Sequence, residues 1–367
     1  MLLSAVALSS LTALASASLA SATPAGPSRS APVISGSGKF RYQFDPTKLK
    51  LPPSVELLHG HGLTKDKAGN IYFTYESEPA AKATPGVRAL IRYEPDGTGG
   101  TLLGDATLAQ GVPHGIKIAE EAGVEYLYHG NNAAKVHKTY TNGTYVWSTD
   151  MTAAWSKNHT HWPFKPTDVL VPPGEDAVFV ADGYGLSKVH EFDVESGKFT
   201  GQVFGGRAEF DCDHGISYDD RVGKIVVSDR ANHRLRWIED DGTVVKTLNL
   251  TASIPLPCNA QTSTGTKLGG GFLIVPGLGI DHADPGPWLN GSVGILDESN
   301  TLVSNIEVAK LLGLGALGHT HPHDAIFLAN GDIAVAIWKG HEKGSLGGLE
   351  YLLWAIIDVI PNPSICP

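Results

Sequence analysis

The chain has 367 residues, 43 of them Gly and 23 Pro, and only 18% are charged. This composition favours a turn-rich β protein over a helical one. The formal net charge of −10 argues against a nucleic-acid partner and gives no reason to expect binding to an anionic membrane.

Residues 1–22 are apolar, rich in small side chains and free of acidic ones, and they end in Ala20-Ser21-Ala22. This pattern is typical of a secretory signal peptide with a small-x-small cleavage site. A membrane anchor is the alternative, although the Ser and Thr content is high for one. We expect residues 23–38 to form a flexible start of the mature chain.

Two further features suit a secreted protein. Four Asn-x-Ser/Thr sequons occur, at Asn142, Asn158, Asn249 and Asn290, which predicts a glycoprotein. The three cysteines, Cys212, Cys258 and Cys366, permit at most one intramolecular disulfide, and we prefer a pairing of the first two. Stability must therefore come from burial over a large fold.

A hairpin unit recurs along the chain, with two short apolar strands joined by a Gly- or Asp-containing turn. Its copies begin at His61-Gly62-Leu63, His114-Gly115-Ile116, Thr167-Asp168-Val169, His214-Gly215-Ile216 and His323-Asp324-Ala325. Successive copies are about 50 residues apart, and the last gap is about twice as long, which places a missing copy near residues 268–281.

Periods of about 40–50 residues with several strands each are typical of propeller blades. We therefore predict one all-β domain over residues 39–367, a six-bladed β-propeller. Segments 140–165 and 280–320 are expected as loops over one face, and a helix only at 304–315. The apolar tail 347–361 is expected to close the last blade rather than span a membrane. A β-sandwich with accidental repeats is the alternative.

In a propeller, equivalent positions of different blades point at a common axis. His61, His114, His214 and His323 are equivalent in this register and should converge on the central channel. Neutral imidazoles that meet in this way suit a borderline-soft ion, Zn²⁺ first. The alternative is that each is a core histidine bonded to neighbouring backbone.

Four stretches carry a resemblance to a known family: VPHGIKI, PTDVLVPPGEDAVFVADGYGLSKVHEF, DHGISYDDRVGKIVVSDRANHRLRWI and HPHDAIFLANGDIAVA, supported by GGGFLIVPG. They resemble the NHL-type propeller of peptidyl-α-hydroxyglycine α-amidating lyase. The resemblance implies an enzyme that breaks the N–Cα bond of a C-terminal α-hydroxyglycine, giving a peptide amide and glyoxylate. It also implies a separate monooxygenase as the supplier of that substrate.

By this resemblance, His114, His214 and His323 are zinc ligands, Tyr184 is the active-site tyrosine and Arg230 the active-site arginine. A base at Tyr184 needs a pKa below the ordinary ~10, which a metal and Arg230 would provide. Arg230 could instead clamp the substrate carboxylate. Rim packing for the tyrosine and an inter-blade ion pair for the arginine remain the structural alternatives.

The resemblance further implies a structural Ca²⁺ site, formed by Asp324 and the backbone carbonyls of Leu63 and Ile116. Such a site would tie the first blade to the last. The alternative for Asp324 is a hydrogen bond to blade backbone.

The sequence departs from the family pattern in three places. Glu76 stands where the family has a second arginine, and Gly185 where it has a cysteine. His61, with His59 beside it, adds an imidazole that could make a four-histidine centre. Two other functions therefore stay open: a non-catalytic propeller that binds a protein or glycan, and a related hydrolase or oxygenase that uses the same metal.

Overall fold

The computed structural model describes residues 32–77, 87–152, 163–279, 290–314 and 320–338, and the backbone of the strand 354–359. Apart from Pro32, these residues belong to one unit, Val33–Pro367. The predicted signal peptide, most of the segment 23–38, Asn158 and Cys366 lie outside the described residues. In the described part of the chain, no helix is long and apolar enough to cross a membrane.

Five antiparallel sheets in the described ranges repeat one four-stranded pattern. The first sheet holds β3 (Leu57–Lys65), β4 (Ile71–Ser77), β5 (Leu90–Tyr93) and β6 (Thr101–Leu103). The second holds β7 (Pro113–Glu121), β8 (Val124–Asn131), β9 (Lys135–Tyr140) and β10 (Tyr145–Asp150). The third holds β11 (Asp168–Leu170), β12 (Ala177–Ala181), β13 (Lys188–Asp193) and β14 (Phe199–Gly205).

The fourth sheet holds β15 (Asp213–Asp219), β16 (Lys224–Asp229), β17 (Arg234–Ile238) and β18 (Val244–Asn249). The fifth holds β19 (Gln261–Thr262), β20 (Leu273–Gly277), β21 (Ser292–Leu296) and β22 (Leu302–Glu307). In each of these sheets, strands that follow one another along the chain are hydrogen-bonded neighbours, so that pairing is local.

One further sheet, the closing sheet, joins both ends of the chain in the order β1-β2-β25-β24-β23. Its strands are β1 (Ile34–Ser37), β2 (Phe40–Asp45), β23 (Pro322–Phe327), β24 (Ile333–Ile337) and β25 (Trp354–Val359). The tail thus pairs within the last sheet, as predicted. The predicted domain start at residue 39 is too late, because β1 pairs with β2 and Ser37 N–H donates to Ser304 Oγ (3.0 Å).

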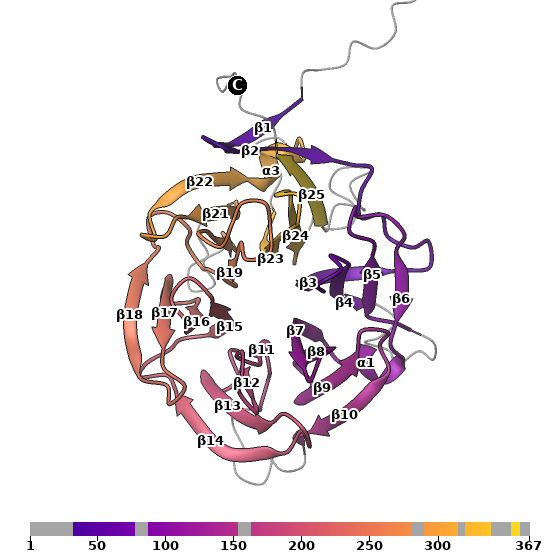
Figure 1. The fold of residues 1–367 in the computed structure, drawn as a ribbon, viewed down its shortest axis with the longest axis vertical. Helices are drawn as coiled ribbons and strands as arrows, with labels where there is room; N and C mark the ends of the chain where they lie inside the picture. The colour runs from indigo at the N-terminus through magenta and orange to yellow at the C-terminus, as the bar shows by residue number, and fades with distance from the viewer. Residues whose placement is uncertain are drawn as a thin grey trace, which may run out of the picture. The chain divides into compact units, whose positions relative to one another are not determined.

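The sheets are arranged in a ring, with β3, β7, β11 and β15 near its centre (Figure 1). This confirms the all-β propeller class. The segments 140–165 and 280–320 were predicted as loops, but β10, β21 and β22 lie in them. Helices are short, as in α1 (Ala106–Ala109) and α3 (Val308–Leu311), and the second falls inside the predicted helical segment.

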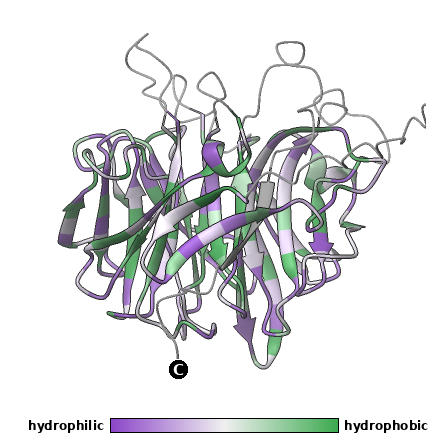
Figure 2. Cartoon of the chain, turned by 90° about the horizontal axis from the view of Figure 1, so that it is seen from above, coloured by the Kyte–Doolittle hydropathy of each residue, from purple (hydrophilic) through white to green (hydrophobic). Residues whose placement is uncertain are grey.

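The hydrophobic core lies between neighbouring sheets. Leu63 and Phe73 of the first sheet pack with Ala334 and Ala336 of the closing sheet. Similar clusters join the third sheet to the fourth and the fourth to the fifth. Figure 2 shows the hydrophobic, green segments within the strands. Because both faces of a blade are covered, its strands read as apolar runs such as AVFVA and KIVVSD rather than as strict alternation.

A buried ion pair links the fourth and fifth sheets. The Asp219 carboxylate accepts from Arg221 Nε and Nη2 (both 2.8 Å) and from Trp237 Nε1 (2.7 Å). Arg221 also donates to the Asp297 carbonyl and to Asn300 Oδ1, both at 2.8 Å. Burial alone would raise the pKa of Asp219, but the hydrogen bonds from Arg221 and Trp237 outweigh it and lower that pKa.

We expect Asp219→Asn to lower the free energy of unfolding by about 3 kcal/mol at neutral pH, because Arg221 would stay buried without its anion. The folded-state pKa lies below the unfolded one. The contribution is therefore complete above an unfolded pKa of about 3.9 and is lost as the pH falls through the folded value. Urea unfolding of both proteins at about pH 7 and about pH 3 measures this. A stability difference that does not shrink in acid would contradict the assignment.

Candidate metal centre and its cavity

Four histidines occupy the same place in four strands. His61 lies in β3, His114 in β7, His214 in β15 and His323 in β23, each where a β-bulge shifts the strand register. A bulge changes the direction of a side chain relative to the regular pleat. All four imidazoles are buried, and the rings converge as the register predicted.

The glycine after three of these histidines lets neighbouring repeats approach each other. A Cβ atom on Gly62, Gly115 or Gly215 would come within 2.8 Å of the backbone of the next repeat. No side chain fits there without moving the main chain. The recurrence of His-Gly in the sequence therefore has a packing cause that is independent of any metal.

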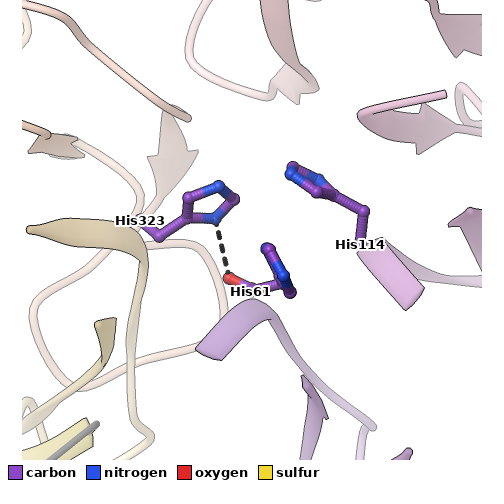
Figure 3. A group of neighbouring side chains, drawn as sticks. All are labelled: His61, His114 and His323. Carbon is purple, nitrogen blue, oxygen red and sulfur yellow. Dashed lines mark hydrogen bonds between the residues drawn. The ribbon is translucent and has the colours of Figure 1, made fainter. Parts of the chain in front are cut away.

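Three of the imidazoles make the same contact, in which Nδ1 donates to a backbone carbonyl of the next repeat. The pairs are His114 with Thr167 (2.6 Å), His214 with Cys258 (2.8 Å) and His323 with His61 (3.1 Å; Figure 3). Because a carbonyl only accepts, the proton of each ring lies on Nδ1. Each Nε2 therefore carries a lone pair, which is without a hydrogen-bond partner among the described residues at His114 and His323.

Three rings form a tight group in the centre (Figure 3). The ring centres of His61 and His114 are 4.4 Å apart, those of His114 and His323 4.6 Å, and those of His61 and His323 5.0 Å. One ring nitrogen from each lies within 4.8 Å of the others. The His214 ring centre is 5.0 Å from that of His114 and 4.6 Å from that of His323. His61, His114 and His323 could thus hold a metal ion.

The electrostatics of this group also suit an ion. Burial lowers the pKa of His114, His214 and His323 well below the usual range, and neighbouring imidazoles add to the effect. Burial lowers the pKa of His61 too, against the opposing effect of Glu76. Among the described residues, Nε2 of His114 and of His323 and both nitrogens of His61 have no hydrogen-bond partner. Neutral, buried and unsatisfied nitrogens are the donor set that Zn²⁺ prefers.

The fourth imidazole, that of His214, is hydrogen-bonded to the Tyr184 hydroxyl. Tyr184 Oη lies 3.1 Å from His214 Nε2 and donates to it, and Arg230 Nη1 donates to the same hydroxyl (3.2 Å). Burial raises the pKa of Tyr184 to about 12, although Arg230 opposes the rise. A catalytic base at Tyr184 was predicted to need a lowered pKa, so the raised pKa is opposite to that prediction. In this arrangement the phenol is protonated at neutral pH.

Arg230 is a buried cation that forms no ion pair with a described residue. It is 6% exposed, and no carboxylate among the described residues lies within 4 Å of its guanidinium. The side chain lines a cavity of about 730 Å³ together with Tyr184, His61 and His323. A buried guanidinium on a cavity wall suits an anionic ligand, because its charge is otherwise uncompensated.

A carboxylate lines the same cavity. Glu76 Oε2 lies 2.8 Å from His59 Nδ1 and 3.9 Å from His61 Nε2, and the second distance is too long for a hydrogen bond. Burial pushes the pKa of Glu76 up, but His59 and His61 together outweigh it and bring the value to about 2. The His59 ring stacks on Trp338, with centres 5.2 Å apart and planes at 23°. Sequence reasoning missed Trp338, because a residue that follows a strand carries no pattern of its own.

The residues implied for calcium are saturated with hydrogen-bond donors. Asp324 Oδ1 accepts from Asn259 Nδ2 (3.2 Å), Gln261 Nε2 (2.9 Å) and the Ala325 N–H (2.8 Å), and Oδ2 accepts from the Leu63 N–H (2.8 Å). The Leu63 carbonyl accepts from Gln261 Nε2 (3.3 Å). Oxygens already bonded to N–H groups are poor ligands for Ca²⁺, which takes six to eight of them.

Asp324, Asp168, Asn259 and Lys117 form a buried polar network, in which Lys117 supplies the positive charge. Lys117, next to Ile116, places Nζ 2.6 Å from Asp168 Oδ2, and Asn259 Nδ2 also donates to that atom (3.2 Å). Burial raises the pKa of Asp168, and that of Asp324 to about 6, while Lys117 opposes both shifts. The oxygens of Asp324 and the Leu63 carbonyl are therefore engaged by donors of the protein itself.

The preferred disulfide is wrong, since Cys212 and Cys258 are both free. Cys258 Sγ lies 3.7 Å from the Leu256 carbonyl, to which it donates, and 4.0 Å from Arg230 Nη1. Burial raises the pKa of each thiol to about 11. The Cys258 thiol thus lies against Arg230 instead of forming a cross-link, and Cys212 lines the cavity.

We expect His61→Ala and His323→Ala each to weaken zinc binding by at least about tenfold, because each removes one ligand of a three-ligand group. Competition with a chromophoric chelator measures the affinity, and His233→Gln, outside the group, is the control. Two results together would contradict this ligand set: unchanged zinc affinity in His61→Ala and loss of zinc affinity in His214→Ala. They would show that His214, as the family resemblance implies, binds the ion instead of His61.

We expect Lys117→Met to lower the free energy of unfolding by about 3–5 kcal/mol, because Asp168 would remain buried without its cation. Adding Asp168→Asn to that variant should recover part of the loss. Lys224→Met removes a partly exposed lysine and should cost less than about 1 kcal/mol. Urea unfolding measures all three variants, and wild-type stability in Lys117→Met would rule out this role for the lysine.

No protein-family model matches the chain. A stretch of 84 residues is 34% identical to "Peptidylglycine alpha-amidating monooxygenase" of Rattus norvegicus and to the corresponding protein of Mus musculus. The match covers 21% of this chain and 8% of each relative. Among solved structures, a luciferin-regenerating enzyme is similar with a TM-score of 0.52 and 10% identity, over 89% of this chain and 94% of that one. The sequence likeness is weak and partial, and the structural likeness concerns the propeller fold.

Proposed function

We propose that this chain is a secreted, zinc-dependent lyase of the amidating type. It would cleave the N–Cα bond of a C-terminal α-hydroxyglycine to give a peptide amide and glyoxylate. The single observation that carries the proposal is the shared cavity: three metal-competent imidazoles, a tyrosine hydroxyl and an unpaired arginine line or adjoin it. The partial likeness to the amidating enzymes of rat and mouse supports it.

Six blades and secretion belong to the same proposal. The closing sheet counts as the sixth blade, because its strand β23 carries His323 at the position that His61, His114 and His214 hold in theirs. Exposure of the sequons Asn142, Asn249 and Asn290 supports a glycosylated chain. A separate monooxygenase would supply the hydroxylated peptide.

Zinc would be held by Nε2 of His114 and His323 and by a ring nitrogen of His61, with His214 beside them. When bound, Zn²⁺ supplies a Lewis acid that lowers the pKa of a hydroxyl in the site. Arg230 would bind the substrate carboxylate with two N–H groups, which its lack of an internal anion permits. Tyr184 Oη would keep its proton, donating it to His214 Nε2 while accepting a hydrogen bond from Arg230.

The bond changes balance without an oxidant or a water molecule. The hydroxyl O–H and the N–Cα bond break, the C=O bond of glyoxylate forms, and the amide nitrogen gains a proton. The protein's contribution is to orient the carboxylate at Arg230 and to keep the reacting carbon in a cavity walled by buried groups.

A second candidate is a metal-dependent propeller hydrolase. Glu76 favours it, because this carboxylate stands on the cavity wall where the amidating family has an arginine.

Release of glyoxylate from α-hydroxyhippurate tests the lyase proposal. We expect His114→Ala to lose at least about a hundredfold in kcat/KM and to lose zinc in parallel. Arg230→Lys should raise KM and lower kcat/KM by about tenfold or more, because an ammonium cannot make the bidentate contact. Arg41→Lys in β2, outside the cavity, is the control. A zinc-loaded wild-type protein that releases no glyoxylate would refute the lyase and leave the hydrolase.

A further inference from the structure

The cavity has two chemically different walls. Tyr184 and Arg230 follow strands of the third and fourth sheets, whereas His59 and Glu76 come from the first sheet. Strands β15 and β16 lie across the ring from β3 and β4 (Figure 1). The cationic wall and the carboxylate wall therefore face the same cavity from different sides.

Glu76 is available to a ligand. Its side chain is 16% exposed, and among the described residues its carboxylate has only His59 and His61 as basic neighbours within 4 Å, with no lysine or arginine. One oxygen, Oε2, accounts for both contacts. The other oxygen has no hydrogen bond to a described residue and can accept one from a molecule in the cavity.

An aromatic face adjoins this carboxylate. The stacked rings of His59 and Trp338 line the cavity beside Glu76. Indole faces attract cations, and a carboxylate next to such a face forms a site for an ammonium or guanidinium group. The same wall would repel an anionic side chain, because like charges brought together in a partly buried site are unfavourable.

We propose that Glu76, with the His59–Trp338 face, selects substrates that carry a basic side chain on the residue directly before the reacting C-terminal unit. This rests on the proposed function for the position of the substrate carboxylate, at Arg230. Glu76 acts as a specificity-determining residue and has no part in the bond changes. The substrate class is then a peptide with a lysine or arginine next to its C-terminal hydroxyglycine.

The test compares acetyl-Tyr-Lys-hydroxyglycine with acetyl-Tyr-Glu-hydroxyglycine, with glyoxylate release as the readout. We expect the wild-type protein to favour the Lys peptide by about tenfold in kcat/KM. Glu76→Gln keeps a hydrogen bond to His59 and should bring the Lys/Glu ratio close to one. Glu76→Arg should invert it. Glu175→Gln, an exposed residue in a turn, is the matched control and should keep the wild-type ratio.

A binding measurement separates this inference from the proposed reaction. Acetyl-Tyr-Lys-Gly and acetyl-Tyr-Glu-Gly lack the reacting hydroxyl, and calorimetry should show tighter binding of the Lys peptide, with the preference lost in Glu76→Gln. If no peptide yields glyoxylate but this preference persists, the lyase reaction is wrong and the basic subsite stands. Equal wild-type affinities, or a ratio that Glu76→Gln leaves unchanged, would overturn the subsite.

Discussion

The hydrogen bond from an imidazole Nδ1 to the carbonyl of the next repeat is the constraint on which the site depends. It occurs at His114, His214 and His323, and at His323 it joins the last repeat to the first. The bond fixes the ring plane and the tautomer together, so that a lone pair on Nε2 faces the axis. At His114 and His214 the glycine that follows lets the repeats approach this closely, because a side chain there would push them apart.

This arrangement has an energetic consequence. Buried imidazoles with unsatisfied nitrogens destabilise a fold unless something binds them. The apolar layers between the sheets, such as the one around Leu63 and Phe73, offset that cost. A metal ion would satisfy the same nitrogens, and the fold would then be stabilised by its own ligand. The centre thus combines buried, unsatisfied nitrogens with a geometry that could hold a metal ion.

Charged side chains lie in two settings, on the walls of the cavity and in a buried polar network. Arg230 on one wall lacks an anion, while Glu76 on another lacks a lysine or arginine among the described residues. In the buried polar network, Lys117 and the Asn259 amide both donate to Asp168 Oδ2, and the Asn259 amide also donates to Asp324 Oδ1. The carboxylates of this network therefore have donors from the protein itself, whereas Arg230 on the cavity wall has no carboxylate within 4 Å among the described residues.

The sequence by itself determined the propeller class and the convergence of the histidines, because both follow from a repeated local pattern. A hairpin pattern that starts with His-Gly and recurs about every 50 residues predicts which strands pair and which positions are equivalent in different repeats. The tertiary structure alone decided what each side chain meets. The donors around Asp324, the thiols beside Arg230 and the stack of His59 on Trp338 come from different repeats. No local spacing encodes such contacts, since they depend on how closely the sheets approach and which atoms then lie within reach.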